Sequence, residues 1–337
     1  MIDQEFSIKV RNLSLLAIVC VVLIHSNSIF ATGEPVSVAA RLADWFFYRL
    51  SAWAVPFFFM MSGFWFALKP TDFGTVMRKK FKTLLVPYVV FLVRSAVALL
   101  PVAYLQARSH GASLWSYSAF RLDFLSIGLL LPAGNGPLWY VRSLLILFLF
   151  APVWRLLYDR LPIVLLALGV LGLVQPAIVL DGWVPFRLGQ SSFFFLGMFL
   201  CKYQLLQKSC QQFPYKRVLF GVLFGLTCLS LFLTRGLQVS GPVPYVLVAF
   251  VWIGFDFLLP LSSPLACGQF VFWIYCTHMI VLEYLLPIAR LLPFPNDWCR
   301  LAATGVVAAI TFFVTIGLAV ACRKVLPRTY QLVCGGR

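Results

Sequence analysis

The sequence predicts an all-α integral membrane bundle of about ten transmembrane helices with both termini in the cytoplasm. Of its 337 residues, 61% are hydrophobic and only 11% are charged, and its mean hydropathy is +0.92. Soluble domains carry about a quarter charged residues, so this composition excludes soluble enzymes, disordered chains and disulfide-stapled secreted domains. Apolar stretches of about 20 residues, the length that crosses a bilayer as a helix, also recur along the whole chain.

The first predicted span follows a short charged stretch at the N-terminus. It is about 19 residues long, lacks a small-residue cleavage site and is followed by further apolar stretches, so we expect a membrane helix and not a cleaved signal peptide. Ten spans are expected near residues 12–31, 46–68, 83–104, 137–154, 161–180, 188–203, 218–234, 243–262, 268–288 and 301–322. No internal repeat or linker separates them, and we expect one membrane domain over residues 1–337.

Positive charge alternates between the loops that join these spans. Most of the 27 lysines and arginines fall in the loops after the second, fourth and sixth spans and at the two chain ends. Since Lys and Arg collect in cytoplasmic loops during insertion, both termini are predicted to be cytoplasmic. The net charge of +16 therefore follows from residence in a lipid bilayer, and we expect no nucleic-acid partner.

The longest segment outside the spans, residues 105–136, is predicted on the outer side. Trp115 and Tyr117 lie beside a short apolar run there, a pattern typical of an interfacial or re-entrant element. An ordinary ordered loop is the alternative.

Two histidines lie inside predicted spans, where ionisable groups are costly and mark functional sites. His25 lies in the first span, 14 residues after Arg11, which corresponds to about 21 Å along a helix axis. A buried imidazole can take a proton from a hydroxyl and return it to a leaving group, so His25 is a candidate general base. The alternative is a histidine that only hydrogen-bonds a neighbouring helix. His278 in the ninth span poses the same two alternatives.

Two arginines are also predicted within spans. Arg94 lies halfway along the third span, and Arg142 follows Trp139 and Tyr140 near the outer start of the fourth. Each arginine is either an internal counter-charge or a clamp for a phosphate or carboxylate, which the forked guanidinium donors suit.

A basic cluster, defined as Arg78, Lys79, Lys80 and Lys82, stands just before the third span on its inner side. It either binds anionic lipid headgroups and enforces topology, or holds the phosphates of a nucleotide-like donor that arrives from the cytoplasm.

Several enzyme classes and metal chemistry lack support. The sequence contains no GxSxG, HExxH, Walker, GxGxxG or HxxxxD pattern, so hydrolase, zinc protease, nucleotidase, Rossmann and HxxxxD acyltransferase functions are not indicated. The nine cysteines are scattered without a CxxC pair or a Cys/His cluster, and we expect no metal.

Six segments, in order along nearly the whole chain, resemble acyltransferase family 3, the multi-spanning membrane O-acyltransferases that modify bacterial surface polysaccharides and lipids. Each string is loose alone, but their joint occurrence with ten predicted spans is specific. The segments are Arg11 to Ser26 (RNLSLLAIVCVVLIHS), Val55 to Phe66 (VPFFFMMSGFWF), Arg78 to Tyr88 (RKKFKTLLVPY), Gly136 to Pro152 (GPLWYVRSLLILFLFAP), Phe193 to Leu200 (FFFLGMFL) and Phe270 to His278 (FVFWIYCTH).

The resemblance implies a membrane O-acyltransferase with His25 as the catalytic base. Its donor would be cytoplasmic acetyl-CoA or another acyl-CoA, bound by the basic cluster. Its acceptor would be a hydroxyl of a cell-surface polysaccharide, lipopolysaccharide or lipid-linked glycan, and the protein would lie in the bacterial cytoplasmic membrane. One departure concerns the arginine, which in the common family form precedes the histidine by eleven residues. Ser14 occupies that position here, and Arg11 lies three residues earlier on a similar helix face.

The expected reaction needs a group that stabilises the oxyanion formed when a thioester is attacked. Arg11, Arg142 and Ser62 are the candidates for it; Trp139, Tyr140 and His278 are further candidates for binding the substrate or the oxyanion. An acyl-enzyme intermediate and a homo-oligomer are both compatible with the sequence. The alternative function is a transporter or flippase of an anionic lipid-linked sugar, although no inverted repeat supports it.

Overall fold

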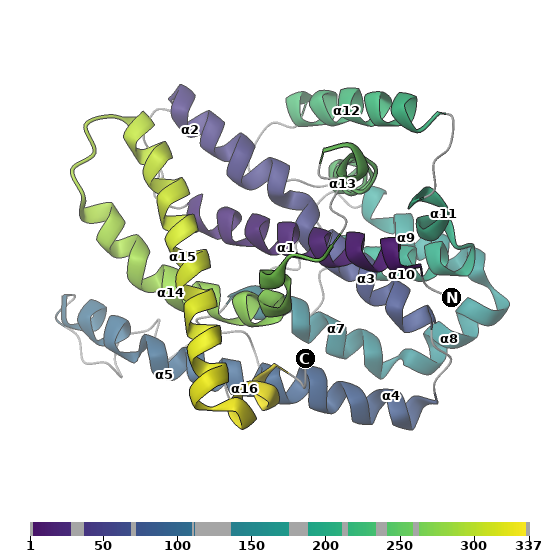
Figure 1. Ribbon diagram of the computed structural model, residues 1–337, viewed down its shortest axis with the longest axis horizontal. Coiled ribbons are helices and arrows are strands. Elements are labelled where there is room, and N and C mark those ends of the chain that lie inside the picture. The colour runs from purple at the N-terminus through teal and green to yellow at the C-terminus, as the bar shows by residue number, and fades with distance from the viewer. Residues whose placement is uncertain are drawn as a thin grey trace. The chain divides into compact units, whose positions relative to one another are not determined.

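The computed structural model describes residues 3–27, 37–68, 72–109, 111, 136–174, 188–210, 215–233, 241–258 and 263–334. The regular structure of these residues is helical throughout (Figure 1), which confirms the predicted all-α class. A helix lies at each of the ten predicted segments. Among the described residues, four helical segments are long and apolar enough to cross a membrane, or five if α7 and α8 form one broken span. The four are Gln4–Ser26, Val38–Leu68, Ala266–Leu291 and Asp297–Val325.

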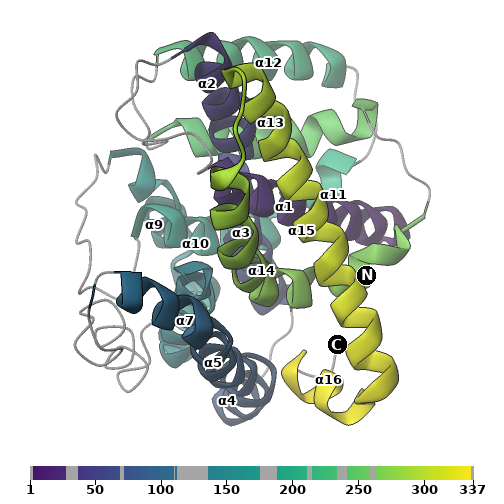
Figure 2. The same cartoon turned by 90° about the vertical axis from the view of Figure 1, so that its left-hand side faces the viewer.

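The described chain forms two compact units, of which the first contains Met1–Ile24, Arg41–Phe73 and Phe150–Gly268. In this unit α3 packs on α10, α10 packs on α9, and α12 packs on α13 (Figure 2). Its elements are most of α1 (Gln4–Ser26), η2 (Asp44–Arg49), η3 (Leu50–Trp53), α3 (Ala54–Leu68), α8 (Ala151–Arg160), α9 (Pro162–Val174), α10 (Leu188–Lys202), α11 (Leu205–Cys210), α12 (Lys216–Leu233) and α13 (Val243–Leu258).

Two glycines allow α3 and α10 to approach closely. A Cβ at Gly63 would overlap the carbonyl oxygen of Phe194, and a Cβ at Gly197 would overlap that of Met60. Small residues let the backbones of membrane helices come together, where van der Waals packing then stabilises the pair. The Ser-Gly pair of the second predicted span thus contributes a packing glycine.

The second unit contains His25–Ala40, Gly74–Leu149 and Gln269–Arg337. Here α14 packs on α15, α5 and η5, while α16 packs on α15 and α5. Leu282, Leu286 and Ala289 of α14 form a buried apolar cluster with Val307 of α15. The elements are α2 (Val38–Ala43), α4 (Phe73–Lys80), η4 (Phe81–Leu85), α5 (Val86–Ser109), η5 (Gly136–Leu138), α7 (Trp139–Leu149), η6 (Ala266–Phe270), α14 (Val271–Leu291), α15 (Asp297–Val325) and α16 (Pro327–Val333).

The predicted span at residues 137–154 is interrupted. Helix α7 ends at Leu149, and α8 begins after Phe150 with a proline in its first turn. That residue is Pro152, which has no N–H to donate and whose ring collides with the carbonyl four residues earlier. A proline is tolerated at a helix start but ends the helix before it, which explains the break.

The outer segment at 105–136 falls largely outside the described residues. Residues 105–109 form the end of α5, and Gly136 begins η5, but residues 112–135 are not described. The expected interfacial or re-entrant element, with Trp115 and Tyr117, therefore stays a prediction.

Candidate active site

The second unit brings together two histidines from opposite ends of the chain. His25 lies at the end of α1 and His278 in the middle of α14. Their ring centroids are 5.4 Å apart, with the planes tilted by 43°. His278 is completely buried. At this separation a nitrogen of one ring can come within hydrogen-bond reach of the other ring if either ring rotates.

The backbone of α14 defines which nitrogen of His278 carries the proton. Its Nδ1 lies 3.1 Å from the carbonyl oxygen of Ile274 and 2.8 Å from that of Tyr275. Because a carbonyl oxygen only accepts hydrogen bonds, Nδ1 must be the protonated nitrogen. The other nitrogen, Nε2, is buried and has no hydrogen-bond partner among the described residues. Neutral His278 therefore presents a lone pair at Nε2.

The helix start that carries Trp139 and Tyr140 lies against α14. The hydroxyl of Tyr275 donates a hydrogen bond to the carbonyl of Pro137 in η5, and the rings of Tyr140 and Tyr275 meet edge to face at 5.7 Å. Trp139 and Tyr140 are both partly buried. This contact holds the start of α7 beside the turn of α14 that precedes His278.

Two arginines of the second unit occupy different surroundings. Arg142 on α7 is partly buried and lies within electrostatic range of Tyr88 on α5. Arg94 is more exposed and places its guanidinium carbon 5.3 Å from the ring centroid of Trp273. Arg94 therefore forms a cation–π contact, and Arg142 is the better placed of the two to act as a clamp inside the unit.

The basic cluster occupies the end of α4 and the start of η4. Arg78, Lys79 and Lys82 are exposed, whereas Lys80 is partly buried with its ammonium nitrogen 3.9 Å from the ring centroid of Phe148. Cations are favourable at the C-terminal end of a helix, which is one reason for their position. Three exposed charges within five residues can also bind a phosphate-bearing ligand.

Arg11 and Ser62 lie in the first unit. Ser62 is partly buried on α3, and Arg11 is exposed on α1. Helix α1 is continuous from Gln4 to Ser26, so Arg11 stands about 21 Å from His25 along the helix axis. Ser14, at the position where the family form has its arginine, donates its hydroxyl hydrogen to the carbonyl of Val10.

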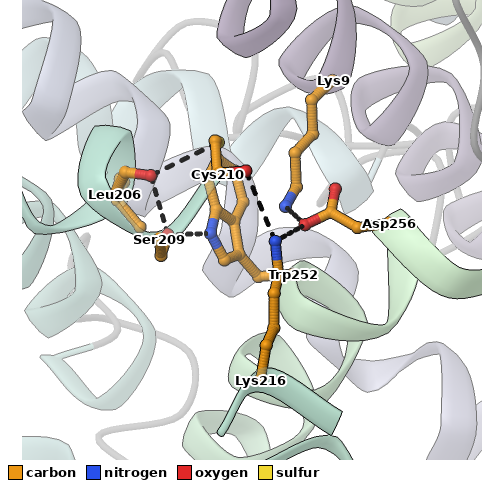
Figure 3. Close-up of polar contacts among 7 residues, drawn as sticks. All are labelled: Lys9, Leu206, Ser209, Cys210, Lys216, Trp252 and Asp256. Atoms are coloured by element: carbon orange, nitrogen blue, oxygen red, sulfur yellow. Dashed lines mark hydrogen bonds and ion pairs between the residues drawn. The ribbon is translucent and has the colours of Figure 1, made fainter. Parts of the chain in front are cut away.

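Sequence reasoning missed a buried charge cluster in the first unit, consisting of Lys9, Lys216 and Asp256. The ammonium nitrogens of Lys9 and Lys216 lie 2.8 Å and 2.9 Å from the same oxygen, Oδ2 of Asp256 (Figure 3). The lysine side chains are 5% and 2% exposed, and that of Asp256 is 22% exposed. The signal in the sequence was an aspartate inside an apolar stretch, which requires a cationic partner.

Aromatic and polar side chains extend the charge cluster toward α11. Lys9 places its nitrogen 4.4 Å from the ring centroid of Trp252, and the indole N–H of Trp252 donates to the hydroxyl oxygen of Ser209 at 2.7 Å. Burial raises the pKa of the neighbouring Cys210 thiol, which therefore stays protonated and weakly nucleophilic. The cluster joins α1, α11, α12 and α13 and is suited to holding them together.

These features define an integral membrane protein of several apolar helices, with two neighbouring histidines, one of them fully buried, in one unit and a structural charge cluster in the other. The acyltransferase domain characteristic of acyltransferase family 3 matches residues 12–324, and the chain belongs to this family. It is therefore a membrane acyltransferase, and the alternative of a transporter or flippase is not supported. Neither the curated proteins nor the solved structures contain a significant match to the chain.

Proposed function

We propose that the protein transfers an acyl group, acetyl in the first instance, from cytoplasmic acyl-CoA to a hydroxyl of a cell-surface polysaccharide, lipopolysaccharide or lipid-linked glycan. The observation that carries this proposal is the histidine pair in a chain of acyltransferase family 3. Membership of the family supports an acyl donor and an acceptor, and an imidazole is the side chain that best moves a hydroxyl proton near neutral pH.

In the proposed reaction His25 acts as the general base. A ring nitrogen of His25 takes the proton of the acceptor hydroxyl while the hydroxyl oxygen attacks the thioester carbonyl carbon. The new C–O bond forms and the C–S bond breaks. The thiolate of CoA then receives the proton from the His25 imidazolium, which restores the neutral base.

The developing oxyanion needs a positive or hydrogen-bonding group. Arg142 is the candidate that shares a unit with both histidines. The residue is partly buried, and electrostatic stabilisation is stronger there than in water. Ser62 and Arg11 remain alternatives, and Trp139 and Tyr140 are proposed to line the substrate site beside Arg142.

We propose that the donor binds through the exposed part of the basic cluster, since CoA carries several phosphate charges. Replacing Arg78, Lys79 and Lys82 together by Gln is expected to raise KM for acyl-CoA about tenfold with a smaller change in kcat. The reason is that these contacts bind the donor equally well in the ground state and in the transition state. The matched control replaces three other exposed cations, Lys208, Arg217 and Lys324, by Gln. An equal rise of KM in both variants would assign the effect to general surface charge.

The remaining architecture is proposed on the same basis. We propose a single membrane domain over residues 1–337, with ten spans and both termini in the cytoplasm. In this topology the basic cluster lies on the cytoplasmic side, where acyl-CoA is made. The bacterial cytoplasmic membrane is the corresponding location. Accessibility of single cysteines introduced at each loop to a membrane-impermeant thiol reagent tests this topology directly.

The test of the function is thioester cleavage and acyl transfer by purified protein in nanodiscs, with acetyl-CoA and a cell-envelope glycan extract. His25→Ala is expected to lose at least about 100-fold in turnover, in line with the contribution of a general base. His110→Ala is the matched control, because His110 is the one histidine of the sequence outside the predicted spans. This variant is expected to keep wild-type turnover. Equal activity of His25→Ala and the control would remove His25 from the chemistry.

A further inference from the structure

His278 is held in one tautomer by its own helix, and this restricts what it can do. With Nδ1–H directed at the carbonyl oxygens of Ile274 and Tyr275, neutral His278 cannot donate from Nε2. It can only accept a hydrogen bond there. A buried acceptor without a donor costs free energy, so the lone pair at Nε2 requires a hydrogen-bond donor nearby.

The neighbouring hydroxyls on α14 are engaged elsewhere. Tyr275 donates to the carbonyl of Pro137, and Thr277 donates to that of Trp273 at 2.8 Å. The other ring at short range is that of His25, from α1, with its centroid at 5.4 Å. An imidazole ring always carries at least one N–H, so His25 can supply the donor if its ring rotates toward His278.

We propose that His278 is a positioning residue for His25, a role that rests on the acyl-transfer function proposed above. An N–H of His25 donates to Nε2 of His278, which leaves the other ring nitrogen of His25 with the lone pair that takes the acceptor's proton. When His25 becomes an imidazolium, the same contact stabilises its charge, and the transferred proton still leaves toward the CoA thiolate. A base oriented by a third group is the general logic of catalytic triads, and catalytic hydrogen bonds are often long before substrate binds.

Two substitutions test the roles of the two ring nitrogens of His278 separately. In His278→Asn the side-chain amide can replace Nδ1–H and keep the bonds to the α14 carbonyls, but it lacks the acceptor at Nε2. In His278→Gln the longer side chain brings an amide oxygen to the place of Nε2, where it can accept the N–H of His25. We expect kcat to fall at least about 100-fold in the Asn variant and to recover to within about tenfold of wild type in the Gln variant, at matched thermal stability. Equal kcat values in the two folded variants would overturn the proposal.

Nitrogen-15 NMR of histidine-labelled protein in nanodiscs gives a readout that does not depend on activity. The chain has three histidines, so single-site variants assign the signals. We expect His278 to be protonated at Nδ1, and the ring signals of His25 to change in His278→Asn but less in His278→Gln. Protonation of His278 at Nε2, or unchanged His25 signals in the Asn variant, would refute the positioning role even if acyl transfer occurs. If the wild type transfers no acyl group while the NMR result holds, the proposed function fails and the histidine contact stands.

Discussion

Removing the carboxylate of Asp256 is expected to destabilise the first unit strongly. In Asp256→Asn the shape is kept, but the ammonium groups of Lys9 and Lys216 lose a negative charge that lies within 3 Å of both. Breaking a buried ion pair by removing one partner costs about 3–5 kcal/mol, because a buried charge is left without compensation. The asparagine oxygen can still accept one hydrogen bond, which favours the lower end of this range.

The expected loss is therefore about 3 kcal/mol, or roughly a hundredfold in the folding equilibrium constant. The assay is reversible titration of the purified protein from detergent micelles into SDS, followed by far-UV circular dichroism. The matched control is Asp159→Asn, whose carboxylate is 51% exposed and lies 3.4 Å from Arg155 one helical turn away. Exposed pairs of this kind contribute about 0.3–0.5 kcal/mol.

A second variant distinguishes destabilisation by an uncompensated buried charge from destabilisation by altered packing. Replacing Lys9 and Lys216 by Met together with Asp256→Leu removes all three charges at similar volume, and such replacements are often neutral or stabilising. We expect this triple variant to be more stable than Asp256→Asn. If Asp256→Asn and Asp159→Asn lose similar stability, or if the triple variant is the least stable, the reasoning from buried charge is wrong.

Three further predictions follow from the packing. Gly63→Ala or Gly197→Ala should each cost about 1–3 kcal/mol by pushing α3 and α10 apart, whereas Gly221→Ala, where a Cβ meets nothing within 4 Å, should be neutral or stabilising in the same SDS titration. Tyr275→Phe should lower the free energy of unfolding by about 1–3 kcal/mol, because the carbonyl of Pro137 is left without its donor. The control is Tyr203→Phe at an exposed tyrosine, and equal losses in both variants would contradict the assignment. In a variant that keeps Cys210 as its sole cysteine, labelling by a thiol reagent at pH 8 should be slower in the folded protein than in SDS and should rise toward higher pH. The reason is that burial raises the pKa of this thiol and leaves less of the reactive thiolate; equally fast labelling of both states would refute it.

The apolar stretches alone placed a helix at each predicted span, because helix formation in a membrane depends mainly on local hydropathy and on backbone hydrogen bonds within the segment. The ordered motifs around His25 and His278 also sufficed to indicate the family, which the match over residues 12–324 confirms. Pro152 stood in the sequence as a local signal for the break between α7 and α8. The predicted site residues and their roles stay proposals.

Only the tertiary structure decided the contacts between residues far apart in the chain. The approach of His25 to His278, the sharing of Asp256 by Lys9 and Lys216, and the close contact of Gly63 with α10 all depend on how helices pack. Hydropathy is the same for every face of an apolar helix, so it does not specify which face meets which partner. The tautomer of His278 is set more locally, by the bonds of Nδ1 to carbonyls of its own helix, α14. The chemical identity of a histidine leaves either nitrogen free to carry the proton.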